Sequence, residues 1–240
     1  MKLQRLRIDI NGVERPVVYD PEKDTLSTVL RRMGLTGVKV GCGIGVCGAC
    51  SIIYNGEVIR SCTKKMKTVE EHAQIITIEG LGTAANLHPL QQAWITYGGV
   101  QCGFCTPGFI MSAYGLLSKN PNPTREEVRE WFRVHKNVCR CTGYKPIVDA
   151  VMAAAAVMRG EKTMADITYD FDGEKDIYGS AHPRPAALPK VLGLADYGND
   201  IELKVPEGVV HLAVVLSESL HANIISIDTS EAEKMPGVIR

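Results

Sequence analysis

The sequence has no excess of charge of either sign, because 27 Lys and Arg residues balance 27 Asp and Glu residues. It therefore gives no electrostatic reason to expect binding to nucleic acid or to an anionic membrane. Apolar residues make up 45% of the 240 residues, yet no apolar run is long enough to span a bilayer. Charged side chains also interrupt residues 1–7, where a secretory signal would need an apolar run. We therefore expect a globular protein of the cytoplasm.

Histidine is scarce, and the six histidines do not group together. A Rieske centre, in which two His and two Cys bind the cluster, is therefore disfavoured. The glycine-rich stretch 41–48 lacks the Lys-Ser/Thr ending of a phosphate-binding loop. With these classes of site disfavoured, the chemistry of the chain depends on its cysteines.

The eight cysteines fall into two groups of four, with none left over. The first group follows the pattern C-x4-C-x2-C with a later fourth member, which is the plant-type 2Fe–2S spacing. It consists of Cys42, Cys47, Cys50 and Cys62. The second group combines a C-x2-C pair with a C-x-C pair. It consists of Cys102, Cys105, Cys139 and Cys141.

Two irons need four thiolates at fixed positions around a compact anionic core. The glycines between residues 41 and 48 let the backbone wrap closely and direct N–H groups at sulfur. Disulfides are disfavoured in a reducing compartment. Zinc is the best alternative because C-x2-C pairs are common zinc ligands. Spacing favours a 2Fe–2S cluster clearly for the first group, and for the second group it leaves zinc open.

Residues 1–80 have the pattern of a small α+β domain. Alternating segments around Asn11-Gly12 and Asn55-Gly56 predict two hairpins. We expect Asp24 to cap a short helix that Gly34 ends, and a further strand at 74–78. Residues 81–160 change to a helical period and predict four helices in a bundle. Within it, Thr124 opens a capping box.

From residue 161 to 192 the periodicity is lost, and we expect an extended linker. The segments 211–216 and 223–227 are predicted strands. Two strands cannot bury a core of their own. We therefore expect residues 193–240 to begin a larger domain that is incomplete here.

The segments 41–50, 101–108 and 139–144 together resemble the iron–sulfur part of the xanthine oxidase family of molybdenum hydroxylases. The resemblance covers about residues 1–160. It implies a plant-ferredoxin-like β-grasp domain (1–80), a four-helix domain (81–160) and a 2Fe–2S cluster in each. Tyr197-Gly198, His221-Ala222-Asn223 and 228–238 resemble the start of the family's molybdenum domain. The order of these parts is similar to that of flavin-free bacterial aldehyde oxidoreductases.

The resemblance implies that electrons leave a molybdenum–pterin centre singly, through the second cluster and then the first. The pterin, in its cytosine dinucleotide form, would be held mainly by sequence beyond residue 240, with Gln101 and Cys141 as contacts here. No FAD is expected in this chain. The expected partners are the rest of the molybdenum domain, in the same or a separate chain, a ferredoxin- or flavodoxin-like acceptor, and a second copy in a homodimer. No catalytic residue is assigned. The alternatives are a stand-alone two-cluster carrier and the iron–sulfur part of a xanthine or carbon monoxide dehydrogenase.

Overall fold

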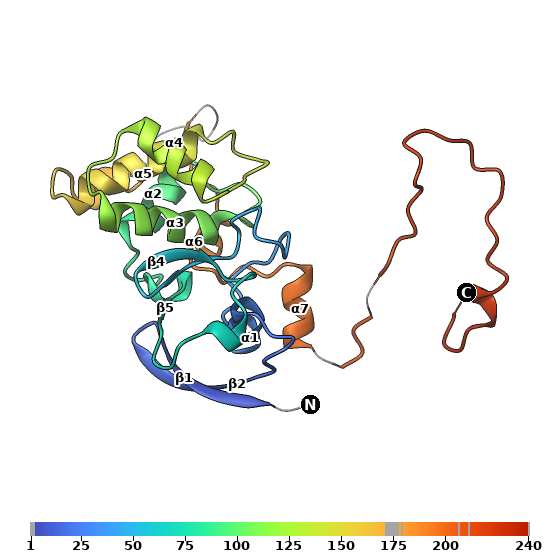
Figure 1. Cartoon of the computed structure of the whole chain (residues 1–240). Coiled ribbons are helices and arrows are strands. Elements are labelled where there is room, and N and C mark those ends of the chain that lie inside the picture. The colour runs from blue at the N-terminus through green and yellow to red at the C-terminus, as the bar shows by residue number, and fades with distance from the viewer. Residues whose placement is uncertain (1–2, 171–177, 179, 206, 211, 240) are drawn as a thin grey trace. The chain divides into compact units, whose positions relative to one another are not determined.

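A computed structural model of the chain describes residues 3–170, 178, 180–205, 207–210 and 212–239. The chain divides into two units, Met1–Pro206 and Glu207–Arg240 (Figure 1). Strands and helices both contribute to the first unit, which confirms the α+β class. In the described ranges, no helix combines the length and the apolar character needed to cross a membrane.

A five-stranded sheet forms the N-terminal part of the first unit. Its strand order is β2-β1-β5-β3-β4. β1 runs parallel to β5, and the other neighbours are antiparallel. The strands are β1 (Gln4–Ile10), β2 (Val13–Tyr19), β3 (Ser51–Tyr54), β4 (Glu57–Arg60) and β5 (Gln74–Ile76).

Both predicted hairpins are confirmed. Asn11 and Gly12 join β1 to β2 with φ values of 55° and 79°. Asn55 and Gly56 join β3 to β4 with φ values of 49° and 83°. Left-handed backbone at both turn positions matches the right-handed twist of the strands, and Asn-Gly tolerates it best.

Strand β3 is buried on both faces of the sheet. Ile52 and Tyr54 pack into a core that includes α1 (Leu26–Arg32), whereas Ile53 packs into the core of the helices. Successive side chains of a strand point to opposite faces, so this strand joins the two cores. The expected cap at Asp24 is wrong. Thr25 caps α1 instead, because its hydroxyl accepts from the Thr28 amide in a capping box.

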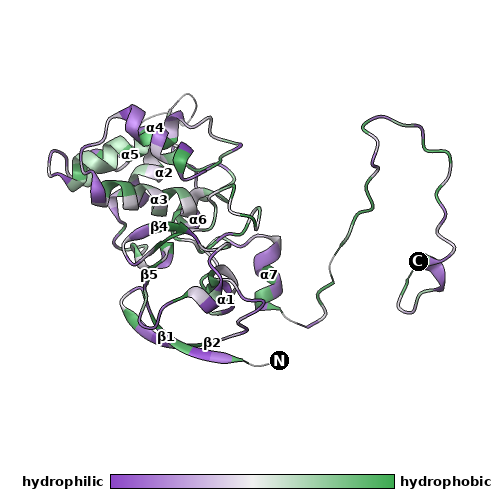
Figure 2. Ribbon diagram, viewed as in Figure 1, coloured by the Kyte–Doolittle hydropathy of each residue, from purple (hydrophilic) through white to green (hydrophobic). Residues whose placement is uncertain are grey.

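Four helices lie between residues 89 and 158, as predicted. They share one core, which buries Trp94, as expected, and also Phe109. The capping box at Thr124 is also confirmed. The helices are α2 (Pro89–Thr96), α3 (Thr106–Lys119), α4 (Arg125–Val134) and α5 (Lys145–Met158). Figure 2 shows the contrast between the mainly apolar α5 and the mixed surface of α4.

The segment expected to be an extended linker is partly helical. It carries the short helical turn η3 (Ala165–Ile167) and α6 (Ala187–Val191), followed by α7 (Gly198–Lys204). Ile167 and Val191 are buried in the helical core. These apolar side chains are too few to show a period in the sequence, yet each one has a place in the core.

The two strands expected near the C-terminus are not formed. His211 lies outside the described residues, and 212–216 and 223–227 have no strand pairing. Their apolar side chains are exposed, Val215 fully so. A strand needs a neighbour for its backbone hydrogen bonds, and the described residues of this unit provide none. The only described helical element of Glu207–Arg240 is the turn η4 (Ala232–Lys234).

Candidate metal centres

The first cysteine group lies on the loop before β3 and on the turn after β4. Cys42 and Cys47 are partly exposed, whereas Cys50 and Cys62 are buried. The thiols meet in two contacts, Cys42 with Cys47 and Cys50 with Cys62. The β3–β4 hairpin thus brings Cys62, the fourth cysteine, next to Cys50, the third.

Backbone amides point at sulfur in the first loop. The Val46 amide donates to the Cys42 sulfur at 3.3 Å. Burial acts to raise the pKa of Cys42, but hydrogen bonds from the Ile44 and Val46 amides outweigh it and lower the pKa to about 7. Gly43 and Gly45 have φ values of 69° and 75°, a left-handed conformation that favours glycine. The sequence-based role of these glycines is therefore supported by the backbone.

The second cysteine group lies at the N-terminal ends of two helices. Cys105 directly precedes α3, and Cys139 and Cys141 precede α5. The thiol contacts join Cys105 to Cys139 and Cys102 to Cys141. Helix N-termini favour anions, which suits thiolates and a negatively charged cluster.

Cys139 is held by two side chains that follow it. Thr142 donates its hydroxyl to the Cys139 sulfur at 3.2 Å, and the Cys139 amide donates to the Tyr144 hydroxyl at 3.1 Å. Burial acts to raise the pKa of Cys139, but the Thr142 hydrogen bonds outweigh it and lower the pKa. Tyr144 itself has a left-handed φ of 68°, an uncommon conformation for a residue other than glycine.

The arrangement in pairs fits a binuclear cluster. A tetrahedral zinc site needs four ligands around one point. Each iron of a 2Fe–2S cluster instead takes two thiolates. Two thiol pairs per group, with N–H and O–H donors directed at sulfur, therefore fit a 2Fe–2S cluster better than zinc.

The two proposed pterin contacts lie at the surface of the first unit. Cys102 and Cys141 are the exposed pair of the second group. The neighbouring Gln101 is exposed too, while its carbonyl oxygen accepts from Lys190 at 2.9 Å and from Arg184 at 3.0 Å. The backbone of Gln101 is thus fixed, and its side chain is accessible to a ligand.

The two cysteine groups are joined through the backbone. The Val138 amide donates to the Cys47 carbonyl oxygen at 3.1 Å. The Asn137 side chain donates to the Gly48 carbonyl oxygen at 3.3 Å. Because Val138 directly precedes Cys139, a short route of covalent bonds and one hydrogen bond links the thiols of the two groups.

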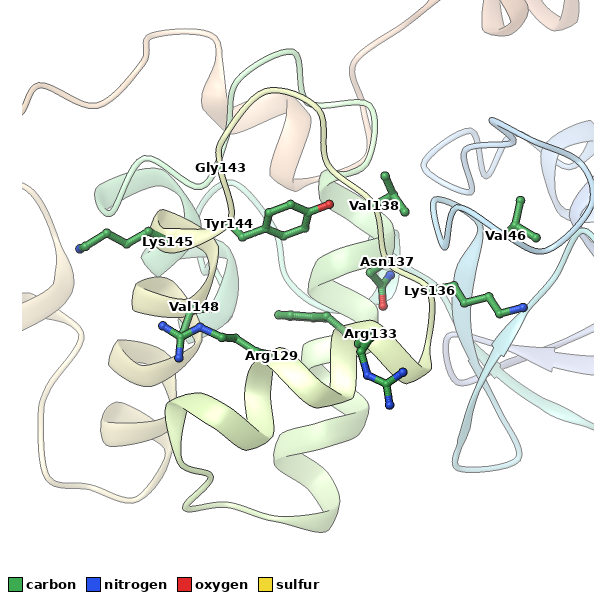
Figure 3. A pocket seen from close by; sticks show the side chains of 11 residues that line it. Val46, Arg129, Arg133, Lys136, Asn137, Val138, Gly143, Tyr144, Lys145 and Val148 are labelled. Carbon is green, nitrogen blue, oxygen red and sulfur yellow. The ribbon is translucent and has the colours of Figure 1, made fainter.

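A cavity of about 660 Å³ opens where these two segments meet (Figure 3). Val46 from the first loop and Val138 from the second line it, together with Arg129, Arg133 and Lys136. Arg129 and Arg133 are paired with Glu126 and Glu130 on the same helix. The cavity therefore combines apolar walls with a basic rim close to Cys47 and Cys139.

Sequence reasoning missed several residues around the two groups. Thr142 and Tyr144 belong to the segment 139–144 that carries the family resemblance, but no role was predicted for either residue. No role in the cysteine sites was predicted for Lys39, Tyr197 or Asp200. The Tyr197 hydroxyl donates to the Cys102 carbonyl oxygen, and Lys39 is paired with Asp200. The one available signal was Lys39, a charge between Val38 and Val40 in an apolar stretch.

Two family models match the chain. The "2Fe-2S iron-sulfur cluster binding domain" matches residues 8–77, and the "[2Fe-2S] binding domain" matches residues 77–152. The chain is 57% identical over 232 residues to the aldehyde oxidoreductase of Megalodesulfovibrio gigas, covering 96% of this chain and 26% of that protein. It is 42% identical over 149 residues to the nicotinate dehydrogenase small FeS subunit of Eubacterium barkeri, covering 62% of this chain and 93% of that subunit.

Solved structures agree with these relationships. The aldehyde oxidoreductase from Desulfovibrio gigas matches with a TM-score of 0.86 and 56% identity, over 99% of this chain and 26% of that chain. The chain thus spans about a quarter of the length of this oxidoreductase and nearly all of the separate small subunit. It belongs to the iron–sulfur portion of the xanthine oxidase family of molybdenum hydroxylases.

Proposed function

We propose that this chain is the electron-transfer portion of a molybdenum-dependent aldehyde oxidoreductase. In this role the chain passes electrons one at a time from a molybdopterin, through the second cysteine group and then the first, to an external acceptor. When bound, the molybdopterin centre oxidises an aldehyde to a carboxylic acid with oxygen from water. The observation that carries the proposal is the set of four thiol pairs, two per group, linked through Val138 and Cys47.

The thiol pairs define what each residue would do. In the first group, Cys42 and Cys47 would bind one iron, and Cys50 and Cys62 the other. In the second, the pairs are Cys102 with Cys141 and Cys105 with Cys139. The accessible Gln101 and Cys141 would contact the pterin, which is proposed in its cytosine dinucleotide form. Most of its binding residues would lie beyond residue 240.

The proposed direction of transfer is supported by what is accessible in each group. Cys102 and Cys141 are exposed, which suits the approach of a pterin carried by another domain. The first loop exposes Ile44 and Val46 beside its partly exposed cysteines. A protein acceptor of the ferredoxin or flavodoxin type can approach there. We therefore propose the second group as the electron entry and the first as the exit.

The aldehyde assignment is supported by the extent of the match. Aldehyde oxidoreductase aligns with 96% of this chain, whereas the xanthine dehydrogenases align with about 60% of it. The region after residue 160 is thus shared with the aldehyde enzyme. This supports a layout in which no flavin domain follows the helices. The two matched family models meet at residue 77, which supports a boundary near residue 80. The boundaries near residues 160 and 192 stay predictions. The homodimer and the cytoplasmic location stay predictions.

Two variants of the full-length enzyme test the route. Cys50→Ala should remove the first cluster and stop turnover with the external acceptor, while the second cluster keeps its paramagnetic resonance signal on reduction. Cys105→Ala should remove the second cluster and leave the first unreduced by aldehyde. Normal turnover of the Cys50→Ala enzyme with its acceptor would show that the exit route is wrong. A stand-alone carrier would be favoured if the wild-type protein contained its irons and neither it nor any copurifying chain contained molybdenum.

A further inference from the structure

Residues 184–204, which include α6 and α7, lie against both cysteine segments, and we call them the clasp. At one end α6 is anchored by apolar packing, because Ala187 and Val191 are buried in the helical core. At the other end α7 is anchored by charge. Between these anchors the clasp passes the loop that carries Cys102.

The charged anchor is buried. Lys39 and Asp200 are each 1% exposed, and the Lys39 ammonium lies 2.7 Å from the Asp200 carboxylate. The second carboxylate oxygen of Asp200 lies 2.7 Å from the Arg31 guanidinium. Lys39 also donates to the Ala195 carbonyl oxygen at 2.8 Å. A buried charge without its partner is strongly unfavourable, so this pairing fixes α7 at one position.

The clasp holds the backbone of the Cys102 loop through three donors. Arg184 and Lys190 donate to the Gln101 carbonyl oxygen, and the Tyr197 hydroxyl donates to the Cys102 carbonyl oxygen at 2.7 Å. The contact is close, since a Cβ added to Gly103 would lie 2.8 Å from the Tyr197 hydroxyl oxygen. The loop is therefore closely fitted to the clasp.

Tyr197 also reaches the segment of the first cysteine group. The Lys39 ammonium lies 4.7 Å from the centre of the Tyr197 ring. Phe104 meets the same ring edge to face at 5.2 Å, and Phe104 in turn borders Gly41, where an added Cβ would lie 3.3 Å from it. The Asp200 carboxylate accepts from the Tyr197 amide at 2.8 Å. The buried anchor thus holds Tyr197 directly.

We propose that Tyr197 is a positioning residue for the second metal centre. Its hydroxyl, held in place by the Lys39–Asp200 pair, keeps the Cys102 loop where the Cys102 thiol meets the Cys141 thiol. Cys105 and Cys139 are fixed by a helix start and by Thr142. Cys102 and Cys141 are exposed and depend on their loops. The inference rests on the proposed function in one respect, namely that these thiols hold a cluster.

The test compares the full-length wild-type protein with its Tyr197→Phe variant, which keeps the ring and loses the hydroxyl. Hydrogen–deuterium exchange across residues 100–106, where the Thr106 amide donates to the Gly103 carbonyl oxygen at 3.2 Å, should accelerate on the order of five- to tenfold, the equilibrium change expected from one lost hydrogen bond. The paramagnetic resonance signal of the reduced second cluster should change, and that of the first should not. Tyr178→Phe is the matched control, because Tyr178 is 99% exposed.

A second variant, Lys190→Met, removes one of the two donors to the Gln101 carbonyl oxygen and should accelerate exchange in the same loop by a smaller factor. Unchanged exchange and unchanged signals in Tyr197→Phe would overturn the proposal. Acceleration spread evenly over the whole unit would also overturn it, because that result describes general destabilisation. Exchange does not need a cluster. A wild-type protein without iron would therefore refute the proposed function, while the exchange result would still decide the role of Tyr197.

Discussion

The amide of Val138 donates a hydrogen bond to the carbonyl oxygen of Cys47 at 3.1 Å. It joins a residue next to the second cysteine group to Cys47, a cysteine of the first group. Val138→Pro removes this N–H, and Val138→Ala keeps it. Val138 is 52% exposed, so neither change disturbs a core. We expect the proline variant to lose about 1 kcal/mol of stability and to transfer electrons more slowly between the two centres.

Rapid-freeze paramagnetic resonance after mixing with aldehyde measures this transfer. In the proline variant, the reduced second cluster should accumulate before the first is reduced. The alanine variant should match the wild type. Equal transfer rates in all three proteins would show that the hydrogen bond is not part of the route.

Gly108, in the first turns of α3, packs directly against the loop of the first centre. A Cβ added there would lie 2.3 Å from the Gly48 carbonyl oxygen and 2.7 Å from that of Ala49. Gly108→Ala should therefore cost about 1–3 kcal/mol in a denaturant titration. It should also alter the first cluster's signal, since Gly48 and Ala49 stand between Cys47 and Cys50. Gly198→Ala, with open space around its Cβ position, is the control and should cost nothing. A Gly108→Ala protein as stable as this control would contradict the packing account.

His88 caps α2 in its neutral form, because its Nδ1 atom accepts from the Leu90 amide at 3.2 Å. Burial lowers the pKa of His88 from 6.5 to about 4. The unfolded chain therefore binds this proton more readily, and the stability from this group is lost as the pH falls from about 6.5 to about 4. We expect a loss of about 2 kcal/mol, allowing for the partly exposed ring.

Denaturant titrations at several pH values within this window measure the loss. His88→Asn supplies a capping oxygen that does not titrate. Its stability should vary less with pH in the same range. An identical pH dependence in both proteins would rule out His88 as the source.

The buried anchor of the clasp predicts a strong stability effect. Asp200→Asn leaves the buried Lys39 and the mostly buried Arg31 without their counter-charge, which should cost about 3–5 kcal/mol. Adding Lys39→Met should recover part of that loss, and a double-mutant cycle measures the coupling. The exposed pair Lys119–Glu57 is the control. Lys119→Met should cost less than about 1 kcal/mol. Additive losses for Lys39 and Asp200 would contradict the anchor.

Local features of the fold could be predicted from the sequence. Asn11-Gly12 and Asn55-Gly56 determine their hairpins through backbone conformations that few other residues tolerate. The capping box at Thr124 could also be predicted, because it is formed by residues close together in the sequence. One short-range choice was wrong, since Asp24 and Thr25 are both good caps and the sequence alone does not choose between them.

Features that depend on distant partners could not be predicted. The pairing of Lys39 with Asp200 spans 161 positions, and it makes residues 198–204 part of the iron–sulfur unit. The segment 212–216 has the pattern of a strand, but in the described residues it has no neighbouring strand. In the candidate sites, spacing identified all eight cysteines, whereas the thiol pairs required the fold.

The most direct test of the account is an analysis of iron, acid-labile sulfide and paramagnetic resonance on the natively purified full-length protein. The thiol pairs predict two irons and two sulfides for each cysteine group, with two distinguishable signals after reduction. Cys50→Ala and Cys105→Ala should each remove one signal and leave the other. Zinc in place of iron, or a colourless protein without sulfide, would contradict the assignment of both centres.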